Sequence, residues 1–507
     1  MNNLKAIKSA FISVFYKDGL DVVVKKLHQL NIQIISTGGT REFIEKMNIP
    51  VIAAESLTGF PSILGGRVKT LHPNIFGGIL ARRDDESDMQ QVEEYKFKLI
   101  DLIIVDLYPF EETVKKGAPD EDIIEKIDIG GISLIRAAAK NFNDVAIVSC
   151  QEQYSYLNEL LEKNNGNTSI EERRKLAAEA FEVTSHYDTH IYKYFAGNSP
   201  TSFKSSIKNS QTLRYGENPH QKGYFYGNLD EIFEKIHGKE ISYNNLLDID
   251  ASIALINEFT EPTVAIIKHN NACGLASRST LLQAWKDALA GDPVSAFGGI
   301  IVTNKNVDKE TALEIDKLFF EVIIAPEYDN DALEVLKLKK NRIILILKNT
   351  DFSSSSFRTL LNGVLEQEKD LKTETINDLR TVTEREPSEQ EIEDLIFANI
   401  LVKHTKSNSI VLAKNKQLLA SGAGQTSRID ALKHSIEKAK SFGFDLKGAV
   451  MSSDAFFPFA DSVEIAYNAG ITAVIQPGGS IRDEDTINFC TNHKMAMVFT
   501  GIRHFKH

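Results

Sequence analysis

Four neighbouring polar residues, Lys268 to Asn271, follow an apolar run that begins at Thr263. The run is β-forming, so the polar side chains fall at the carboxyl end of an expected strand, where open α/β sheets place their ligands. An ammonium beside an imidazole lowers the pKa of the imidazole and leaves it able to accept a proton near pH 7. Lys268 and His269 can reach one substrate only if the chain bends there, because successive strand residues face opposite ways. The cluster is a candidate catalytic site, and a plain strand end at the surface is the alternative.

A glycine-containing turn joins an expected strand to a helix at Ser36, Thr37, Gly38, Gly39 and Thr40. Free backbone amides and the positive end of the helix suit a phosphate there. The alternative is an ordinary tight turn. The chain contains neither P-loop nor dinucleotide-binding spacing, so ATP hydrolysis and NAD chemistry lose support.

Three more candidates lie in the N-terminal part of the chain. Lys69 belongs to an irregular segment, Leu64 to Arg82, whose two glycine pairs are typical of a ligand-binding loop. Tyr108 follows a long apolar run, at the expected ligand-binding edge of a sheet. Asp128 precedes Gly130-Gly131 and an expected helix, where it could orient an amine. The ordinary alternatives are a solvated lysine, a tyrosine that covers the core and a helix entry.

His186 and His190 are four residues apart on an expected helix and look like a metal-binding pair. Asp188 would point elsewhere, no glutamate completes an H-E-x-x-H motif, and Tyr187 belongs to the apolar stripe of the helix. We therefore expect a structural role for this pair and no metal site. The three cysteines are far apart and predict neither a disulfide framework nor a cysteine zinc site.

Three segments of the C-terminal part could bind an anionic or flat ligand. Arg214 lies in the turn-rich sequence LRYGENPHQ and suits bidentate contact with phosphate or carboxylate. Phe456 to Phe459, interrupted by Pro458, could receive a flat ring, although core packing is the ordinary explanation. The basic tail that contains Arg503 could close over an anion, although chain ends are usually frayed.

The order of expected elements is that of an α/β protein. Strand 5–15, helix 18–30, strand 32–36 and helix 41–47 give a βαβα pattern with short connections, which predicts a doubly wound parallel sheet. A long helix then begins at the capping box of Ser169.

The long helix ends at Gly197, and a linker-like composition follows it. This places a boundary near residue 200, with domains 1–199 and 200–507. The second domain alternates strands and helices again and is long enough for two subdomains. Lys268-His269 and Lys403-His404 both border β-like runs, which is weak evidence for a duplication.

Composition limits the classes of ligand. The chain has 507 residues, of which 42% are apolar and 25% charged, as in soluble globular proteins. Its formal net charge of −12 argues against nucleic acid and anionic membrane as partners, because both need a basic face. No run approaches the roughly 18 to 20 apolar residues that span a bilayer. We expect a cytoplasmic protein that acts on small molecules.

Six motifs together resemble one known family. They are LGGRVKTLHP (64–73), LYPF (107–110), IDIGG (127–131) followed by SLIRAAAKN, LRYGENPHQ (213–221), GAGQTSRID (422–430) and SSDAFFPF (452–459). In this order they are similar to the bifunctional purine biosynthesis enzymes that combine AICAR formyltransferase with IMP cyclohydrolase.

This resemblance implies a fold and two reactions. The fold is an N-terminal domain like methylglyoxal synthase and two C-terminal subdomains like cytidine deaminase without its zinc, in a homodimer. The first reaction transfers a formyl group from the co-substrate 10-formyltetrahydrofolate to AICAR. The second closes formyl-AICAR to IMP with loss of water, and no metal is required.

By matching position, the resemblance also assigns the transferase roles. Lys268 would stabilise charge on the formyl oxygen or assist the leaving folate nitrogen, His269 would accept the proton of the amine, and Asn408 would orient the carboxamide or formyl group. The residues that would hold the nucleotide and line the space for base and pterin are Arg214, Tyr215, Arg428, Arg503, Phe456, Phe457, Pro458 and Phe459.

For ring closure, the resemblance assigns catalysis to four residues. Lys69 would polarise the formyl oxygen and Tyr108 would relay protons. Asp128 with Lys140 would position the attacking carboxamide. The residues that would bind the phosphate and ribose are Ser13, Lys17, Ser36, Thr37, Gly38, Gly39, Thr40, Arg67 and Thr70.

The cyclohydrolase motifs depart from the family pattern at two places. The first loop, usually Ser-Val-Ser-Asp-Lys, has Phe15 and Tyr16 in its middle, and the usual Asn before Leu-Tyr-Pro-Phe is Asp106. Because both changes fall in the expected site, a transferase with impaired cyclohydrolase is one alternative. A non-catalytic purine-nucleotide sensor on the same scaffold is another, and the intact transferase cluster argues against it.

Overall fold

The chain forms two compact units, residues 1–207 and 208–507. The computed structural model describes residues 4–61, 63–64, 67–197, 201–348 and 352–507. The boundary expected between residues 199 and 200 falls on residues 198–200, which lie outside the described ones.

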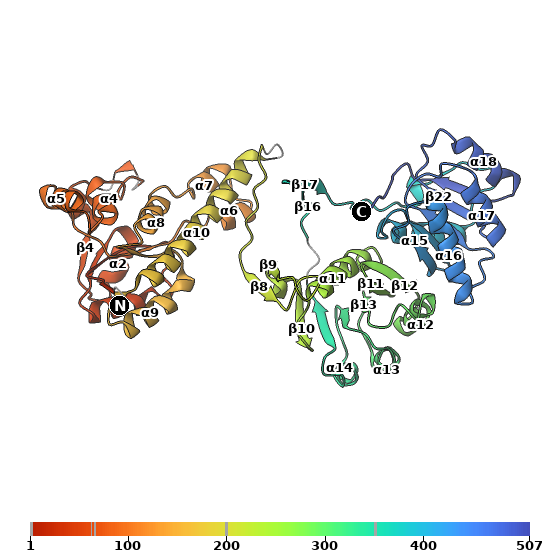
Figure 1. The fold of residues 1–507 in the computed structure, drawn as a ribbon, viewed down its shortest axis with the longest axis horizontal. Helices are drawn as coiled ribbons and strands as arrows, with labels where there is room; N and C mark the ends of the chain where they lie inside the picture. The colour runs from red at the N-terminus through yellow and green to blue at the C-terminus, as the bar shows by residue number, and fades with distance from the viewer. Residues whose placement is uncertain (1–3, 62, 65–66, 198–200, 349–351) are drawn as a thin grey trace. The chain divides into compact units, whose positions relative to one another are not determined.

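The first unit is built on a five-stranded parallel sheet with the order β4-β3-β2-β5-β6 (Figure 1). The expected parallel sheet is therefore confirmed. Its strands are β2 (Ser9–Ser13), β3 (Gln33–Ser36), β4 (Val51–Ala53), β5 (Leu102–Val105) and β6 (Ala146–Val148), and β1 (Lys5–Ala6) pairs separately with β7 (Asn167–Thr168). β5 and β6 are buried along their whole length, as strands of a covered parallel sheet are.

Several helices of this unit arise where the sequence predicts them, but α4 forms inside the segment 64–82 that was expected to be irregular. In α1, at the expected helix 18–30, the apolar residues Leu20, Val23, Val24 and Leu27 lie at helical spacing and are buried. The capping box of Ser169 opens α10 as expected. The helices are α1 (Leu20–Gln29), α2 (Gly38–Glu45), α3 (Ala54–Thr58), α4 (Pro73–Leu80), α5 (Glu86–Glu94), α6 (Phe110–Lys115), α7 (Asp120–Ile124), α8 (Gly130–Lys140), α9 (Tyr154–Lys163) and α10 (Ile170–Ala196).

The second unit contains a twelve-stranded sheet, made of two α/β repeats of five strands each with β10 and β18 at its edges (Figure 1, green and blue). Each repeat has a helix, an antiparallel hairpin, a second helix and three parallel strands joined by helices. The first comprises α11 (Tyr243–Ile256), β11 (Thr263–Lys268), β12 (Asn271–Ser277), α12 (Leu281–Gly291), β13 (Ile300–Thr303), α13 (Lys309–Ile315), β14 (Val322–Ala325), α14 (Asn330–Leu336) and β15 (Ile343–Leu347).

The second repeat has the same order of elements and meets the first between β12 and β20. It comprises α15 (Glu389–Lys403), β19 (Ile410–Lys414), β20 (Gln417–Gly422), α16 (Arg428–Ser441), β21 (Val450–Ser453), α17 (Asp461–Ala469), β22 (Ala473–Gln476), α18 (Asp483–Asn492) and β23 (Ala496–Phe499). The remaining strands are β8 (Ser210–Leu213), β9 (Gly223–Tyr226), β10 (Phe233–His237), β16 (Ser355–Leu360), β17 (Gly363–Glu368) and β18 (Arg380–Thr381).

The duplication is real, but the dipeptides that hinted at it are not equivalent. Lys268 ends β11, whereas Lys403 ends α15. The counterpart of Lys268 in the second repeat is Lys414, which ends β19. Among the described residues, no helix is both long enough and apolar enough to cross a membrane.

Candidate active sites

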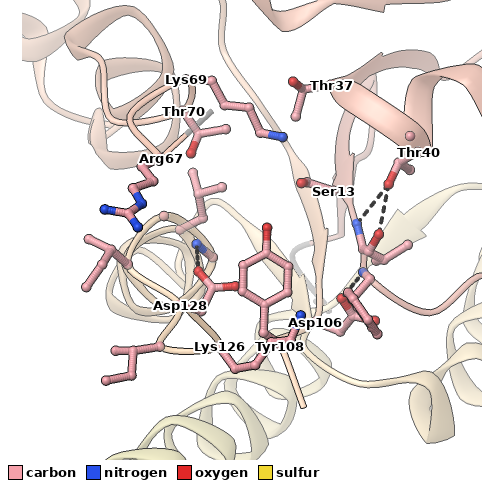
Figure 2. Close-up of a pocket in the computed structure, with 18 of the residues that line it drawn as sticks. Ser13, Thr37, Thr40, Arg67, Lys69, Thr70, Asp106, Tyr108, Lys126 and Asp128 are labelled. Carbon is pink, nitrogen blue, oxygen red and sulfur yellow. Dashed lines mark hydrogen bonds between the residues drawn. The ribbon is translucent and has the colours of Figure 1, made fainter. Parts of the chain in front are cut away.

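A cavity of about 1160 Å³ lies in the first unit at the carboxyl ends of β2, β3 and β5. This is the edge at which parallel sheets bind ligands. Ten of the residues predicted to serve this site line the cavity, namely Ser13, Lys17, Thr37, Gly39, Thr40, Arg67, Lys69, Thr70, Tyr108 and Asp128. The Lys69 ammonium and the Tyr108 hydroxyl point into the space that Ser13 and Asp128 border (Figure 2).

The first turn of α2 forms one wall of the cavity and suits an anion. Gly38 has a φ of 53°, and a Cβ at this position would lie 3.1 Å from the Lys69 Nζ. Glycine therefore allows the lysine to approach the start of the helix, where unpaired amides attract negative charge. Thr40 holds the loop that follows β2. Its hydroxyl accepts a hydrogen bond from the Val14 amide and donates one to the Val14 carbonyl.

Asp128 is fixed at the start of α8. Its Oδ1 accepts a hydrogen bond of 2.6 Å from the Gly131 amide, and its own amide donates to the Tyr187 hydroxyl at 2.9 Å. A Cβ at Gly131 would lie 2.8 Å from the carboxylate, so the position needs glycine. Burial raises the pKa of Asp128. A carboxyl held this firmly can orient a substrate amide.

Tyr108 stands beside two residues that the motifs did not single out as partners. The Phe15 ring meets the Tyr108 ring edge-on, with centroids 5.6 Å apart. The Lys126 Nζ lies 5.9 Å from the centroid of Tyr108 and 5.8 Å from that of Phe15. Burial, followed by the charges of Asp128 and Asp106, raises the pKa of Tyr108. The phenol therefore stays protonated at neutral pH and can donate its proton.

Asp106 holds the first loop by a pair of backbone contacts. Its two carboxylate oxygens accept hydrogen bonds from the amides of Phe15 and Tyr16. An asparagine has only one acceptor oxygen and could not offer a separate oxygen to each amide. Burial lowers the pKa of Lys17, which donates to the carbonyl oxygens of Val14 and Phe15. The two departures from the family pattern are thus structurally linked.

Two predicted side chains of this site do not line the cavity, and a third lines it while paired with a carboxylate. The Ser36 side chain is fully buried and donates to the Ile12 carbonyl, so it joins strands and does not face a ligand. Lys140 is exposed at the far end of α8, about 15 Å along the helix from Gly130 by its rise per residue. It does not line the cavity of this single chain. Arg67 does line the cavity but pairs with Glu125.

The second unit has a cavity of about 400 Å³ at the turn between β11 and β12. Lys268 and His269 both line it. His269 and Asn270 have φ values of 52° and 63°, so the chain makes the bend that lets both side chains face one ligand. The Lys268 ammonium donates to the Phe297 carbonyl. Residues not predicted from the sequence complete the lining: Cys273, Ser295, His434 and Lys438 are among them.

Asn408 and Arg428 form a polar cluster with Asp454, which the SSDAFFPF motif contains. One Arg428 nitrogen donates to Asn408 at 3.1 Å and to Asp454 at 2.9 Å. The chain end runs past this cluster, because the His504 amide donates to the Asp454 carbonyl. The cluster connects to the β11–β12 turn through Asn271, whose side-chain oxygen accepts from the Lys406 amide at 3.0 Å.

Two other predicted groups lie outside the second cavity. Arg214 is exposed after β8, with its guanidinium 5.4 Å from the ring centroid of Tyr215. Arg503 lies 4.3 Å from the ring centroid of Phe505.

The aromatic patch is only partly available to a ligand. Phe456 and Phe459 are exposed, as is Pro458, but Phe457 is fully buried in the core of the second repeat. The prediction that Phe457 lines a ligand site is therefore wrong, because the chain alternates direction there and turns this ring inward.

The two cavities define a class of protein. Each lies at strand ends of an α/β unit and combines cations with groups that can donate or accept protons, as the active sites of enzymes for small anionic substrates do.

Comparison with known proteins agrees with this class. The model of the AICARFT/IMPCHase bienzyme family matches residues 138–438, and that of the MGS-like domain matches residues 19–133. The bifunctional purine biosynthesis protein PurH of Bacteroides thetaiotaomicron is 64% identical over 507 residues, with both chains covered completely. Those of Caldicellulosiruptor saccharolyticus and Aquifex aeolicus are 47% and 49% identical, covering 99% and 98% of this chain and all of each relative. This chain belongs to the AICARFT/IMPCHase bienzyme family, which confirms the resemblance seen in its motifs.

Proposed function

We infer that this chain catalyses both reactions of its family. The first transfers the formyl group of 10-formyltetrahydrofolate to the amine of AICAR, and the second closes formyl-AICAR to IMP with loss of water. Family membership over the full length supports the pair of activities. The observation that carries the division of labour is the presence of two cavities in two separately folded units.

In the second unit, we assign formyl transfer to the β11–β12 turn. His269 accepts the proton of the attacking amine, and Lys268 stabilises negative charge on the formyl oxygen. Asn408 orients the substrate amide, supported by its contact with Arg428. Arg214, Tyr215 and Arg503 hold the nucleotide in this assignment, and Phe456 and Phe459 offer their exposed rings to its base or to the pterin.

In the first unit, we assign ring closure to the larger cavity. Phosphate binds at the first turn of α2, beside Lys17. Lys69 polarises the formyl oxygen, Asp128 orients the carboxamide nitrogen that attacks it, and Tyr108 supplies a proton to the departing water. Because the attack is intramolecular, orientation by a few fixed groups provides much of the rate.

We further propose that the chain works as a homodimer in the cytoplasm. Its two domains, 1–199 and 200–507, divide near residue 200. Exposed Lys140 and Arg214 are candidates to act across the dimer, since neither lines a cavity of its own chain.

One assay tests the function. With AICAR and 10-formyltetrahydrofolate, appearance of tetrahydrofolate and IMP is expected. Accumulation of formyl-AICAR would indicate a transferase with impaired cyclohydrolase, and absence of tetrahydrofolate would indicate a nucleotide sensor. His269→Ala should abolish formyl transfer yet still convert added formyl-AICAR to IMP. Tyr108→Phe should still transfer the formyl group but fail to close formyl-AICAR to IMP. Loss of both reactions in either variant would contradict two separate sites.

A further inference from the structure

A cluster of three metal-ligating side chains lies in the first unit, outside the cavity. His186 and His190 share one face of α10, four residues apart, and Glu111 faces them from α6. The three ligand atoms lie within 4.8 Å of one another. We propose that these residues bind a structural zinc ion, contrary to what the sequence motif alone led us to expect.

The geometry of the cluster matches a zinc site. The Glu111 Oε2 is 3.1 Å from the His186 Nε2 and 3.5 Å from the His190 Nε2. Bonds of about 2.0–2.1 Å in a tetrahedral zinc complex place neighbouring ligand atoms about 3.3 Å apart. Two imidazoles and one carboxylate are a ligand set that zinc takes in catalytic sites, where water holds the fourth position. Here none of the three residues lines either cavity, so the ion would have a structural role. The glutamate that the H-E-x-x-H motif lacks is thus supplied by another helix.

The surroundings orient the ligands. The His186 Nδ1 lies 2.8 Å from the Ser206 Oγ, a contact that fixes the ring and leaves Nε2 directed at Glu111. Histidine ligands commonly make such a second hydrogen bond. The Lys115 ammonium contacts the other carboxylate oxygen of Glu111, Oε1, at 2.8 Å. The three ligand side chains retain 12%, 24% and 35% exposure, so an ion can enter from solvent.

The site would join two elements that position the cyclohydrolase residues. Glu111 follows Phe110, which is buried edge-on against Tyr187 of α10. In the sequence, Tyr187 comes between the two histidines, and its hydroxyl accepts a hydrogen bond from the Asp128 amide. A zinc ion bound to Glu111 and the histidines would therefore fasten α6 to α10 behind Tyr108 and Asp128. The ion takes part in neither reaction and serves to stabilise the first unit.

The test uses full-length protein stripped of metal and then dialysed against zinc chloride, with bound zinc measured by mass spectrometry. The wild type should bind one zinc per chain at this site, and His186→Asn, His190→Asn and Glu111→Gln should each lose that equivalent. His28→Asn, which changes an exposed histidine of the same unit, is the matched control and should keep it. Cobalt(II) should give the visible absorption of a four-coordinate site in the wild type and in His28→Asn, but in none of the three ligand variants.

Two further measurements separate zinc binding from a merely structural role of the side chains. Ser206→Ala should keep the stoichiometry but weaken zinc affinity by about 10- to 100-fold, as loss of an outer-shell hydrogen bond does. Zinc should raise the melting temperature of the wild type and not that of the ligand variants. Equal zinc binding by the wild type and the three ligand variants, or no binding by the wild type, would overturn the proposal.

Discussion

Asp248 and Asp394 perform the same task in the two repeats of the second unit. Asp394 accepts hydrogen bonds of 2.8 and 2.7 Å from the amides of Asn415 and Lys416, the turn between β19 and β20. Asp248 accepts one of 2.7 Å from the Asn270 amide and contacts the His269 amide, in the turn between β11 and β12. Both carboxylates stand six residues after a serine helix cap, Ser242 or Ser388. Only the first turn carries a histidine, His269, which we propose as the base of formyl transfer.

This equivalence predicts different effects of one substitution at two places. Asp248→Asn removes an acceptor from the turn that holds His269, so formyl transfer should fall by about 100-fold, the cost of a misplaced catalytic group. Asp394→Asn should leave transfer much less affected. Each change should destabilise the unit by about 1–3 kcal/mol, because the turn loses hydrogen bonds to a charged acceptor.

The fluorescence of Trp285 can measure this destabilisation. It is the chain's single tryptophan and is buried in the second unit. Both variants should lower the urea midpoint similarly, and cyclohydrolase activity should persist in both. Equal loss of formyl transfer in the two variants would contradict a positioning role for Asp248.

Phe15 predicts a second effect, on the cyclohydrolase. Its edge-on contact with Tyr108 is worth about 0.5–1.5 kcal/mol. If that contact holds the phenol in place, Phe15→Ala should lower the kcat of ring closure by about 2- to 12-fold. Tyr95→Ala, an exposed aromatic of the same unit outside the cavity, is the control. A Phe15→Ser variant faster than wild type would show that the family's hydroxyl matters more than the ring.

The sequence allowed the local parts of the fold to be predicted better than the long-range contacts. Apolar spacing and the cap of Ser169 located α1 and α10, because these signals are contained within a few residues. The loop held by Asp106 depends on a contact across 91 residues, which no spacing reveals. Glu111 completes the histidine cluster across a comparable separation of 75 residues.

In the candidate sites too, residues within a local pattern could be predicted and those placed by long-range packing could not. Lys268 and His269 were recognisable because a strand end with titratable groups is a local pattern, and the required bend is present in the backbone. Phe457 was misassigned because neighbouring phenylalanines look alike in sequence, although only tertiary packing decides which ring turns inward.

Glu258 predicts sensitivity of the second unit to acid. Burial alone would raise its pKa, but hydrogen bonds from His404, Lys403 and Thr373 outweigh burial and lower the pKa to about 2. A depressed folded-state pKa stabilises the protein above the unfolded value of about 4.5 and loses this effect as the pH falls toward 2. The contribution is about 3 kcal/mol.

Urea midpoints measured between pH 7 and pH 3 can check this effect. Glu258→Gln should lower the midpoint at neutral pH and flatten its decline below pH 4.5. Glu261→Gln alters a half-exposed carboxylate nearby and should retain the wild-type profile. A Glu258→Gln profile parallel to that of the wild type would contradict the assignment.

His504 predicts the opposite dependence on pH, in the chain end beside Arg503. Burial by itself would lower the pKa of His504, but hydrogen bonds to Glu374 and Asp370 outweigh burial and raise it. A raised folded-state pKa gives stability that is complete below the unfolded value of about 6.5 and is lost as the pH rises through the folded value. Alkaline pH should therefore loosen the tail, and the KM for AICAR should rise because Arg503 loses its support.

His504→Gln isolates this effect from the other titrating groups of the transferase site. The variant should have a raised KM for AICAR already at neutral pH and a smaller further rise in alkali than the wild type, because it has no proton to lose there. His507→Gln, at the exposed last residue, should follow the wild-type profile. A His504→Gln variant whose KM climbs with pH as steeply as that of the wild type would show that the tail is held by other contacts, such as that between Lys506 and Ser407.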